Sequence, residues 1–346
     1  MEIAKQGISM SEKITIVEIA KMANVSTATV SRIINNTGTV SQEKRKVVLD
    51  LIKKYDYQPN QIAKALQARK SNMIGFVVPH INSPYYAQLF YETEVIAKKH
   101  GYTLMLCNSE SDKELESNIL NEFVSANVRA IVFLGGRLDD MKCGRSYISE
   151  IENINKKIPV ISCCEIPQLN CVQVFQNTQK STQLLLRHLA DLGIRDVAML
   201  GGDGNIRTTK SRREEIYNSA EQYGIQVRRE IIESDYSVAG GNEAMQKLIQ
   251  QKNLPQAIIC INDLVATGAL NEAKKNKLSV PKDIAITGYD NLDISQYIYP
   301  GITTIACNYS EYGKAIVDAI NNIDEIDVNA KISVEADFVV RGTTRL

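Results

Sequence analysis

From Met73 to the C-terminus, the chain alternates short apolar runs with helical stretches. The runs "MIGFVVP", "TLMLCNS", "AIVFLG" and "PVISCC" have the pattern of buried strands, and the alternation resumes with "VAMLGG", "AIICIN" and "AITGYD". Buried strands separated by helices are typical of parallel sheets that helices cover on both faces. The sequence therefore predicts an α/β body of two doubly wound parallel-sheet lobes, whose strand ends surround a cleft where a ligand can bind.

The first part of the chain follows a different pattern, that of three short helices. Thr15 precedes "IVEIAKMA" and Glu18 follows three residues later, which is a capping box and predicts a helix from about Ile16 to Met22. After the turn "ANV", Ser26 can cap a second helix, and Ser41 can cap a third over "QEKRKVVLDLIKKYD". We therefore expect a small all-α head with a helix-turn-helix arrangement.

The second helix of the head has a short, polar outer face, which suits a helix that lies in the major groove of DNA. Arg32 can reach a guanine edge or a phosphate, while Thr27 and Ala28 offer a hydroxyl and a methyl to the bases. Hydroxyl groups nearby can bind phosphate oxygens, which orients the helix without reading sequence. The DNA contacts expected from the head are Thr15, Ser26, Thr27, Ala28, Thr29, Ser31, Arg32 and Asn35.

Charge is distributed unevenly along the chain, although the whole chain is neutral. Residues 1–70 carry 12 Lys and Arg against 6 Asp and Glu, a net charge of +6, so the remainder carries 28 against 34, a net charge of −6. A basic head on an acidic body indicates a polyanionic partner for the head alone. With no apolar run of about 18 residues, no signal sequence and seven scattered cysteines without a CxxC pair, we expect a cytoplasmic protein without a membrane segment.

Catalysis is not indicated by any group of residues. The three histidines, His80, His100 and His188, stand far apart in the sequence. The loop "GGDGN" lacks the Lys-Ser/Thr of a phosphate-binding loop and the spacing of a dinucleotide fingerprint. We therefore expect neither an enzyme nor a bound cofactor or metal.

Motifs along nearly the whole chain resemble the lactose-repressor/galactose-repressor (LacI/GalR) family of bacterial transcription regulators. In the head these are "VSTATVSRIIN", "VSQEKRKVV" and "YQPNQIAKAL", and in the body "INSPYY", "INDLVATGAL", "VPKDIAITGYDN" and "FVVRGTT". The resemblance implies lobes like those of periplasmic binding proteins and a small-molecule effector that controls binding to an operator. It also implies a hinge helix in which Leu66 wedges into the minor groove, flanked by Asn60, Ala63 and Lys64.

The resemblance and the expected elements together give a domain plan. We expect a flexible tail (1–13), the helix-turn-helix head (14–58), a hinge helix and linker (59–71) and an effector-binding, dimerising body (72–346). Within the body, the N-lobe should comprise about 72–172 and 309–336, and the C-lobe about 173–308 and 337–346.

Residues of the effector site are implied by matching family motifs one position at a time. The effector-binding arginine of the family falls on Arg213. Arginine, amide and carboxylate groups suit the hydroxyls of a polyol, and tyrosine rings suit its apolar face. The expected effector contacts are Tyr85, Tyr86, Arg207, Thr209, Arg213, Tyr236, Asn262, Asp290 and Tyr309.

Three positions depart from the family pattern and bear on the identity of the ligand. Ile216 replaces a glycine, Gln176 an aspartate, and Cys164 stands where a strand commonly ends in aspartate. The sequence thus predicts a repressor in the bacterial cytoplasm, associated with the nucleoid, that binds a pseudo-palindromic operator as a homodimer. The expected effector is a sugar or sugar derivative; Arg207 together with Arg213 keeps open a purine or phosphorylated metabolite that acts as a corepressor.

Overall fold

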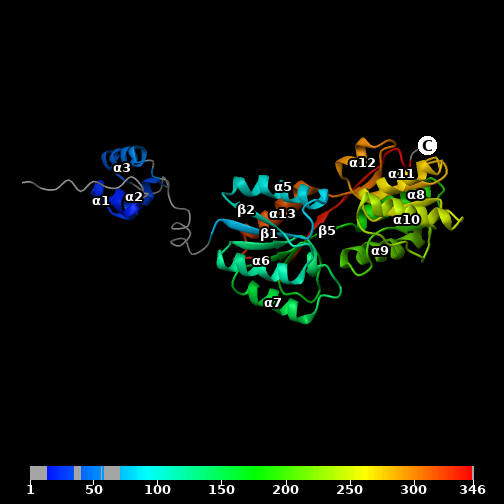
Figure 1. Ribbon diagram of the computed structural model, residues 1–346, viewed down its shortest axis with the longest axis horizontal. Coiled ribbons are helices and arrows are strands. Elements are labelled where there is room, and N and C mark those ends of the chain that lie inside the picture. Colours follow the sequence, from blue (N-terminus) through cyan, green and yellow to red (C-terminus); the bar gives the residue numbers. More distant parts are fainter. Residues whose placement is uncertain (1–13, 35–39, 56, 58–70, 345–346) are drawn as a thin grey trace, which may run out of the picture. The chain divides into compact units, whose positions relative to one another are not determined.

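The computed structural model describes residues 14–34, 40–55, 57 and 71–344, and the chain divides into two units, 1–70 and 71–346 (Figure 1). We call the described part of the first unit the head and that of the second the body. No helix in these described residues is both long enough and apolar enough to cross a membrane.

The head consists of α1 (Ile16–Met22), α2 (Thr27–Ile34) and α3 (Gln42–Lys54). The predicted capping box is confirmed at α1: the backbone N–H of Thr15 donates to Glu18 Oε2 at 2.7 Å, and Glu18 N donates to Thr15 Oγ1 at 3.4 Å. Ser26 accepts from Thr29 N at 3.1 Å, whereas the side chain of Ser41 makes no capping hydrogen bond. The three helices pack around a small hydrophobic core, which consists of Ile19, Ala20, Val30, Ile33 and Val48.

The body contains two six-stranded sheets, one in each lobe, which confirms the predicted fold class. The N-lobe sheet has the order β11-β5-β4-β3-β1-β2 and is parallel throughout. Its strands are β1 (Met73–Val78), β2 (Thr103–Asn108), β3 (Ala130–Phe133), β4 (Val160–Ser162), β5 (Val172–Asn177) and β11 (Lys331–Glu335).

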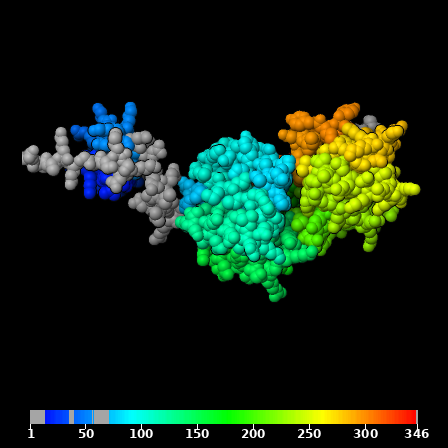
Figure 2. Space-filling view, viewed as in Figure 1, coloured from blue at the N-terminus to red at the C-terminus, as the bar shows by residue number. Residues whose placement is uncertain are grey.

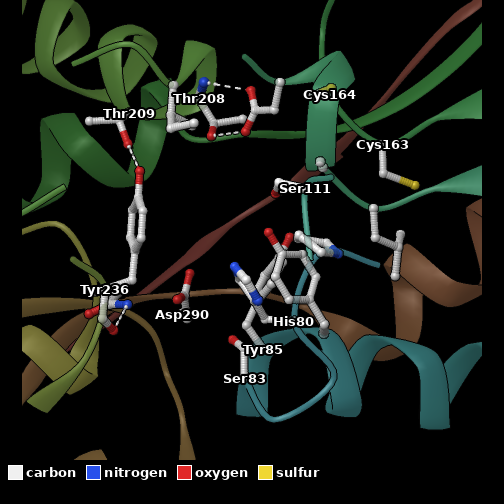
Figure 3. Close-up of a pocket in the computed structure, with 18 of the residues that line it drawn as sticks. His80, Ser83, Tyr85, Ser111, Cys163, Cys164, Thr208, Thr209, Tyr236 and Asp290 are labelled. Carbon is white, nitrogen blue, oxygen red and sulfur yellow. Dashed lines mark hydrogen bonds between the residues drawn. The ribbon is translucent and has the colours of Figure 1, made fainter. Parts of the chain in front are cut away.

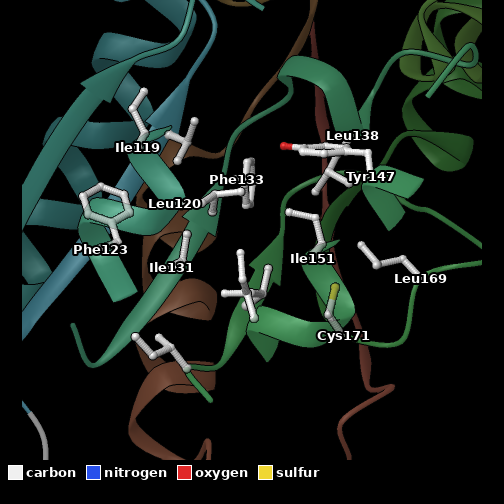
Figure 4. Packing of buried hydrophobic residues seen from close by; sticks show 14 of the residues in the cluster. Ile119, Leu120, Phe123, Ile131, Phe133, Leu138, Tyr147, Ile151, Leu169 and Cys171 are labelled. Atoms are coloured by element: carbon white, nitrogen blue, oxygen red, sulfur yellow. The ribbon is translucent and has the colours of Figure 1, made fainter. Parts of the chain in front are cut away.

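Helices cover both faces of the N-lobe sheet. On one face α6 (Lys113–Ser125) and α7 (Arg145–Asn155) bury a cluster that includes Phe123, Phe133 and Tyr147 (Figure 4). On the other face α5 (Pro84–Lys99) and α13 (Tyr309–Asn321) pack against the strands. The short 3-10 helix η1 (Gly136–Leu138) follows β3 and leads back toward the C-lobe.

The C-lobe sheet has the order β12-β10-β9-β8-β6-β7, parallel except for β12, which pairs antiparallel with β10. Its strands are β6 (Asp196–Leu200), β7 (Gln226–Val227), β8 (Ala257–Cys260), β9 (Ala285–Asp290), β10 (Thr303–Ala306) and β12 (Asp337–Val339). Its helices are α8 (Gln179–Asp191), α9 (Arg207–Ala220), η2 (Glu221–Tyr223), α10 (Val238–Gln250), α11 (Asp263–Lys275) and α12 (Asp293–Tyr297). One face packs against α8 and α9 and the other against α10 and α11.

The chain passes between the lobes three times: after β5, between β10 and α13, and between β11 and β12. The expected start of the C-lobe at residue 173 is too early, because β5 runs to Asn177 and pairs with β4 and β11 of the N-lobe. The carboxyl ends of strands from both sheets therefore face the space between the lobes, where ligands bind in folds of this type.

Candidate functional site

The outer face of α2 is open to solvent. Thr27, Ala28 and Arg32 are exposed, while Val30 and Ile33, on the opposite side, are buried in the core of the head. Ser26 and Thr29 share a hydrogen bond of 2.9 Å between their hydroxyls at the start of the helix. A short polar face with an exposed arginine can lie against a DNA groove.

Some of the expected DNA contacts have other partners or lie elsewhere. The hydroxyl of Thr15 donates to Glu18 Oε2 at 2.9 Å, so its role in the head is to cap α1. Ser31 is half-buried. The remaining expected contacts lie outside the described residues: Asn35, Asn60, Ala63, Lys64 and Leu66.

A pocket of about 260 Å³ lies between the two lobes of the body (Figure 3), and the surface is hollowed where they meet (Figure 2). The N-lobe contributes residues that follow strand ends, such as His80 after β1, Gly135 after β3 and Cys164 after β4. The C-lobe contributes Arg212 from α9 and Asp290 from the end of β9. Both lobes therefore have to be in place for the pocket to exist.

Arg212 and Asp290 form the charged centre of the pocket. Arg212 Nη2 lies 3.4 Å from Asp290 Oδ1, and Arg212 Nη1 donates to the carbonyl of Ile261 at 3.1 Å. The guanidinium also stacks 3.7 Å from the ring centre of Tyr289. Burial raises the pKa of Asp290, and the charge of Arg212 opposes that rise. The pair thus places one partly buried cation and one buried anion within reach of a ligand.

Arg213, the arginine expected to bind the effector, points away from this pocket. Its Nη1 lies 2.9 Å from Glu233 Oε1, and its Nη2 donates to the carbonyls of Gly201 and Gly202, each at 2.9 Å. Successive residues of a helix are rotated by about 100°, so two neighbouring arginines cannot face the same side. Arg213 therefore lies outside the wall of this pocket, and Arg212 is the arginine that lines it.

Arg207 and Tyr309 also lie outside the pocket wall. The backbone N–H of Arg207 donates to the carbonyl of Asp139, and its side-chain Nε is buried without a partner. The ring of Tyr309 packs behind Tyr85, with 5.8 Å between the ring centres. Neither residue therefore lines the pocket.

Six of the expected effector contacts do line the pocket: Tyr85, Tyr86, Thr209, Tyr236, Asn262 and Asp290. Thr209 and Tyr236 share a hydrogen bond of 2.7 Å between their hydroxyls. The side chain of Asn262 is already engaged, because its Oδ1 accepts from Val265 N at 2.8 Å and its Nδ2 donates to the carbonyl of Tyr236 at 3.0 Å. Asn262 therefore caps α11 and holds the Tyr236 loop.

The sequence expectation missed several wall residues, above all Asp139, Thr208 and Arg212. Asp139 Oδ2 accepts from the hydroxyl of Thr208 at 2.6 Å, across the boundary between the lobes. Burial raises the pKa of Asp139, while the bonds from Thr208 oppose the rise. Its position shortly after the end of β3 is the one signal in the sequence that could have identified it.

Asp263 lies buried beneath the pocket and titrates in an accessible range. Its Oδ2 accepts from Leu292 N and its Oδ1 from the hydroxyl of Thr304, both at 2.7 Å, which holds the turn after Asp290. Burial, reinforced by the charge of Asp290, raises the pKa of Asp263 from 3.8 to about 8. The folded state therefore keeps a proton that the unfolded chain has released across this interval.

This proton makes stability depend on pH. Since the folded state binds more protons than the unfolded state between about pH 4 and pH 8, Asp263 lowers the free energy of unfolding as pH rises through that range. Asp263→Asn should flatten the decline in the free energy of unfolding, because an asparagine side chain does not titrate in this range. The substitution should keep the local contacts, since its oxygen can accept from Leu292 N and its amide can donate to Thr304. Urea unfolding at pH 5, 6, 7 and 8 measures the effect, with the exposed Asp293→Asn as control. An unchanged slope in Asp263→Asn would contradict the assignment.

Comparison with known proteins gives matches over both units. The profile described as "Bacterial regulatory proteins, lacI family" matches residues 15–60, and that described as "Periplasmic binding protein-like domain" matches residues 186–344. The chain is 30% identical over 335 residues to the HTH-type transcriptional regulator DegA of Bacillus subtilis (strain 168), covering 96% of this chain and 98% of DegA.

Two further proteins are similar over nearly the whole chain. The HTH-type transcriptional repressor PurR of Pasteurella multocida (strain Pm70) is 29% identical over 335 residues, which cover 96% of this chain and 98% of PurR. Among solved structures, the Lac repressor dimer bound to operator and the anti-inducer ONPF matches with a TM-score of 0.87 at 23% identity, covering 97% of this chain and all of that one. The fold of that structure is thus also the fold of this chain.

Proposed function

Because the chain belongs to the lacI family of bacterial regulatory proteins, we propose that it is a repressor that binds operator DNA through α2 and is controlled by a small molecule in the pocket between its lobes. The observation that carries the proposal is the pairing of an exposed polar recognition helix with a pocket that both lobes build. A ligand that bridges the lobes changes how they sit together, and operator and ligand then alter each other's affinity by the same factor.

We propose a neutral, polyhydroxylated ring compound of monosaccharide size as the effector. Among the described residues that line the pocket, Arg212 is the one arginine or lysine, and Asp290 and Asp139 already lie close to it. The pocket therefore offers no surplus positive charge to a phosphate or a carboxylate. Carboxylates, hydroxyls and a guanidinium suit vicinal hydroxyls, and a volume of about 260 Å³, just below the usual range for ligand pockets, suits a small ligand.

Two arguments for an anionic effector lose their support. Arg213 is ion-paired with Glu233, and Arg207 does not line the pocket. A neutral purine stays the second candidate, because the rings of Tyr85 and Tyr86 offer a stacking surface in the wall.

A thermal-shift screen of the full chain tests the effector class. The probes are neutral monosaccharides, hexose phosphates, sugar acids and purine bases. We expect stabilisation by a neutral monosaccharide, since a ligand at 100 times its Kd adds about 2.7 kcal/mol to the free energy of unfolding. Stabilisation by purine bases would favour the second candidate, and stabilisation by hexose phosphates alone would contradict the charge argument.

We further propose that the repressor acts as a homodimer on the bacterial chromosome in the cytoplasm, and that it catalyses no reaction. Tyr297 and Tyr299, at the end of α12 and just beyond it, are 76% and 86% exposed. Neighbouring exposed aromatic side chains are typical of a surface that another protein covers. Two α2 helices, one from each protomer, would match the two half-sites of a pseudo-palindromic operator.

A further inference from the structure

Helix α9 begins without a capping side chain of its own. Its N-cap residue is Ile206, whose side chain cannot accept a hydrogen bond, and its first turn contains no acidic residue. The first N–H groups of a helix have no partner within the helix and need an acceptor from elsewhere. Four other helices of the body carry their own caps, in Asp112 (α6), Ser237 (α10), Asn262 (α11) and Asn308 (α13).

The missing acceptors are supplied by Asp139 of the opposite lobe. Its carbonyl accepts from Arg207 N at 2.7 Å. Its Oδ1 accepts from Thr208 N at 2.9 Å and its Oδ2 from the hydroxyl of Thr208 at 2.6 Å, the two dashed bonds at Thr208 in Figure 3. A carboxylate is also the favourable charge at a helix N-terminus. Asp139 is thus the cap of α9, although it belongs to the N-lobe and α9 to the C-lobe.

Backbone contacts beside Asp139 join the lobes at the same place. Met141 N donates to the carbonyl of Asn205 at 2.8 Å, and Asp140 pairs with Ile206 in an antiparallel bridge. None of these contacts lies on the three chain crossings between the lobes. They require the lobes to be together and would be lost if the lobes moved apart.

The loop that carries Asp139 is itself held firmly in the N-lobe by Glu116. Glu116 Oε1 accepts from Arg137 N at 3.1 Å and from the hydroxyl of Ser109 at 3.0 Å, and its Oε2 accepts from the hydroxyl of Tyr147 at 2.6 Å. Gly136 has a φ of +71°, and a Cβ there would collide with Glu116. The cap therefore moves with the N-lobe and not with the helix that it caps.

We propose that Asp139 is a positioning residue of the effector site: closure of the lobes supplies the N-cap of α9, the helix that carries Thr208, Thr209 and Arg212 into the pocket. In the open form α9 loses its cap, and its first turn, which holds the pocket residues of the C-lobe, becomes less ordered. The order of the C-lobe half of the site thus depends on the position of the N-lobe. The proposal rests on the proposed function only in taking this pocket as the effector site.

Amide hydrogen exchange of the ligand-free full chain tests the proposal. Asp139 lines the pocket, so a change in ligand affinity alone would not separate contact from positioning. In Asp139→Ala, the amide of Thr208 loses its acceptor and should exchange faster by about fivefold or more, the usual effect of a lost cap, whereas the amide of Arg207 keeps the backbone carbonyl of residue 139. In Asp139→Asn most of the protection should return, because asparagine retains a capping acceptor.

Asp112→Ala is the matched control, since Asp112 caps α6 within the N-lobe by accepting from Leu115 N at 2.8 Å. It should speed exchange at the start of α6 and leave α9 unchanged. Unchanged protection of α9 in Asp139→Ala would overturn the proposal, as would faster exchange of α9 in Asp112→Ala to the same extent. Because no ligand is added, the hydrogen-exchange result can be interpreted even if no effector is found.

Discussion

Arg212→Met is expected to abolish the response to the effector and to lower the free energy of unfolding by about 3 kcal/mol. The substitution removes the cation that lies 3.4 Å from Asp290 and leaves that carboxylate buried without its charged partner. Breaking a buried ion pair from one side typically costs about 3–5 kcal/mol. The ligand also loses the one guanidinium in the described pocket wall. Thermal shift with the compound that stabilises the unsubstituted protein measures the response, and urea unfolding measures the stability.

Arg213→Met provides the control on the next position of the same helix. It removes the bonds to Glu233 and to two glycine carbonyls, so some stability should be lost. The pocket wall stays intact, and the affinity for the compound should change by no more than about threefold, or about 0.7 kcal/mol. Loss of the response in Arg213→Met with a retained response in Arg212→Met would mean that the arginine assigned from sequence is the correct one.

Arg32→Ala is expected to weaken binding to the operator by about 10- to 100-fold, the usual cost of losing an arginine that contacts a base. Arg32 is exposed on the outer face of α2, where nothing else in the described head holds it in a particular place. If it reads a base edge, binding to random DNA should fall much less than binding to the operator.

Lys53→Ala is the matched control for Arg32→Ala, because Lys53 is an exposed basic residue in the last turn of α3. Fluorescence anisotropy on operator and random duplexes at several salt concentrations compares the two variants. Equal losses on both duplexes in Arg32→Ala would identify a phosphate contact instead, with a smaller salt dependence than that of the unsubstituted chain.

The arrangement of elements could be predicted from the sequence because it depends on local patterns. The capping box at Thr15 and Glu18 and the short apolar runs of the body are local patterns, and the structure contains the helix and strands that they predict. The lobe boundary at about residue 173 was too early because the local pattern of β5 suits a strand in either lobe, and its pairing with β4 and with β11 places it in the N-lobe.

The pocket could be predicted only in part, because its details depend on partners distant in sequence. Two adjacent arginines look alike in a sequence, and Arg213 is turned away by Glu233, which comes from a separate loop. Asp139 of the N-lobe was missed because it is bonded to Thr208, which belongs to the C-lobe and is distant in the sequence. Strand-end positions such as Asp290 were predictable, because parallel strands bring their carboxyl ends to one edge of a sheet.

The central claim is that operator binding and pocket occupancy are coupled in one molecule. The most direct test is a titration of an operator, selected by the full chain from a pool of random duplexes, with and without the compound that stabilises the protein in the thermal-shift screen. We predict two chains per operator and a change in operator affinity of about tenfold or more, matched by an equal change in affinity for the compound when operator is present. An operator affinity that is the same with and without the bound compound would contradict the account.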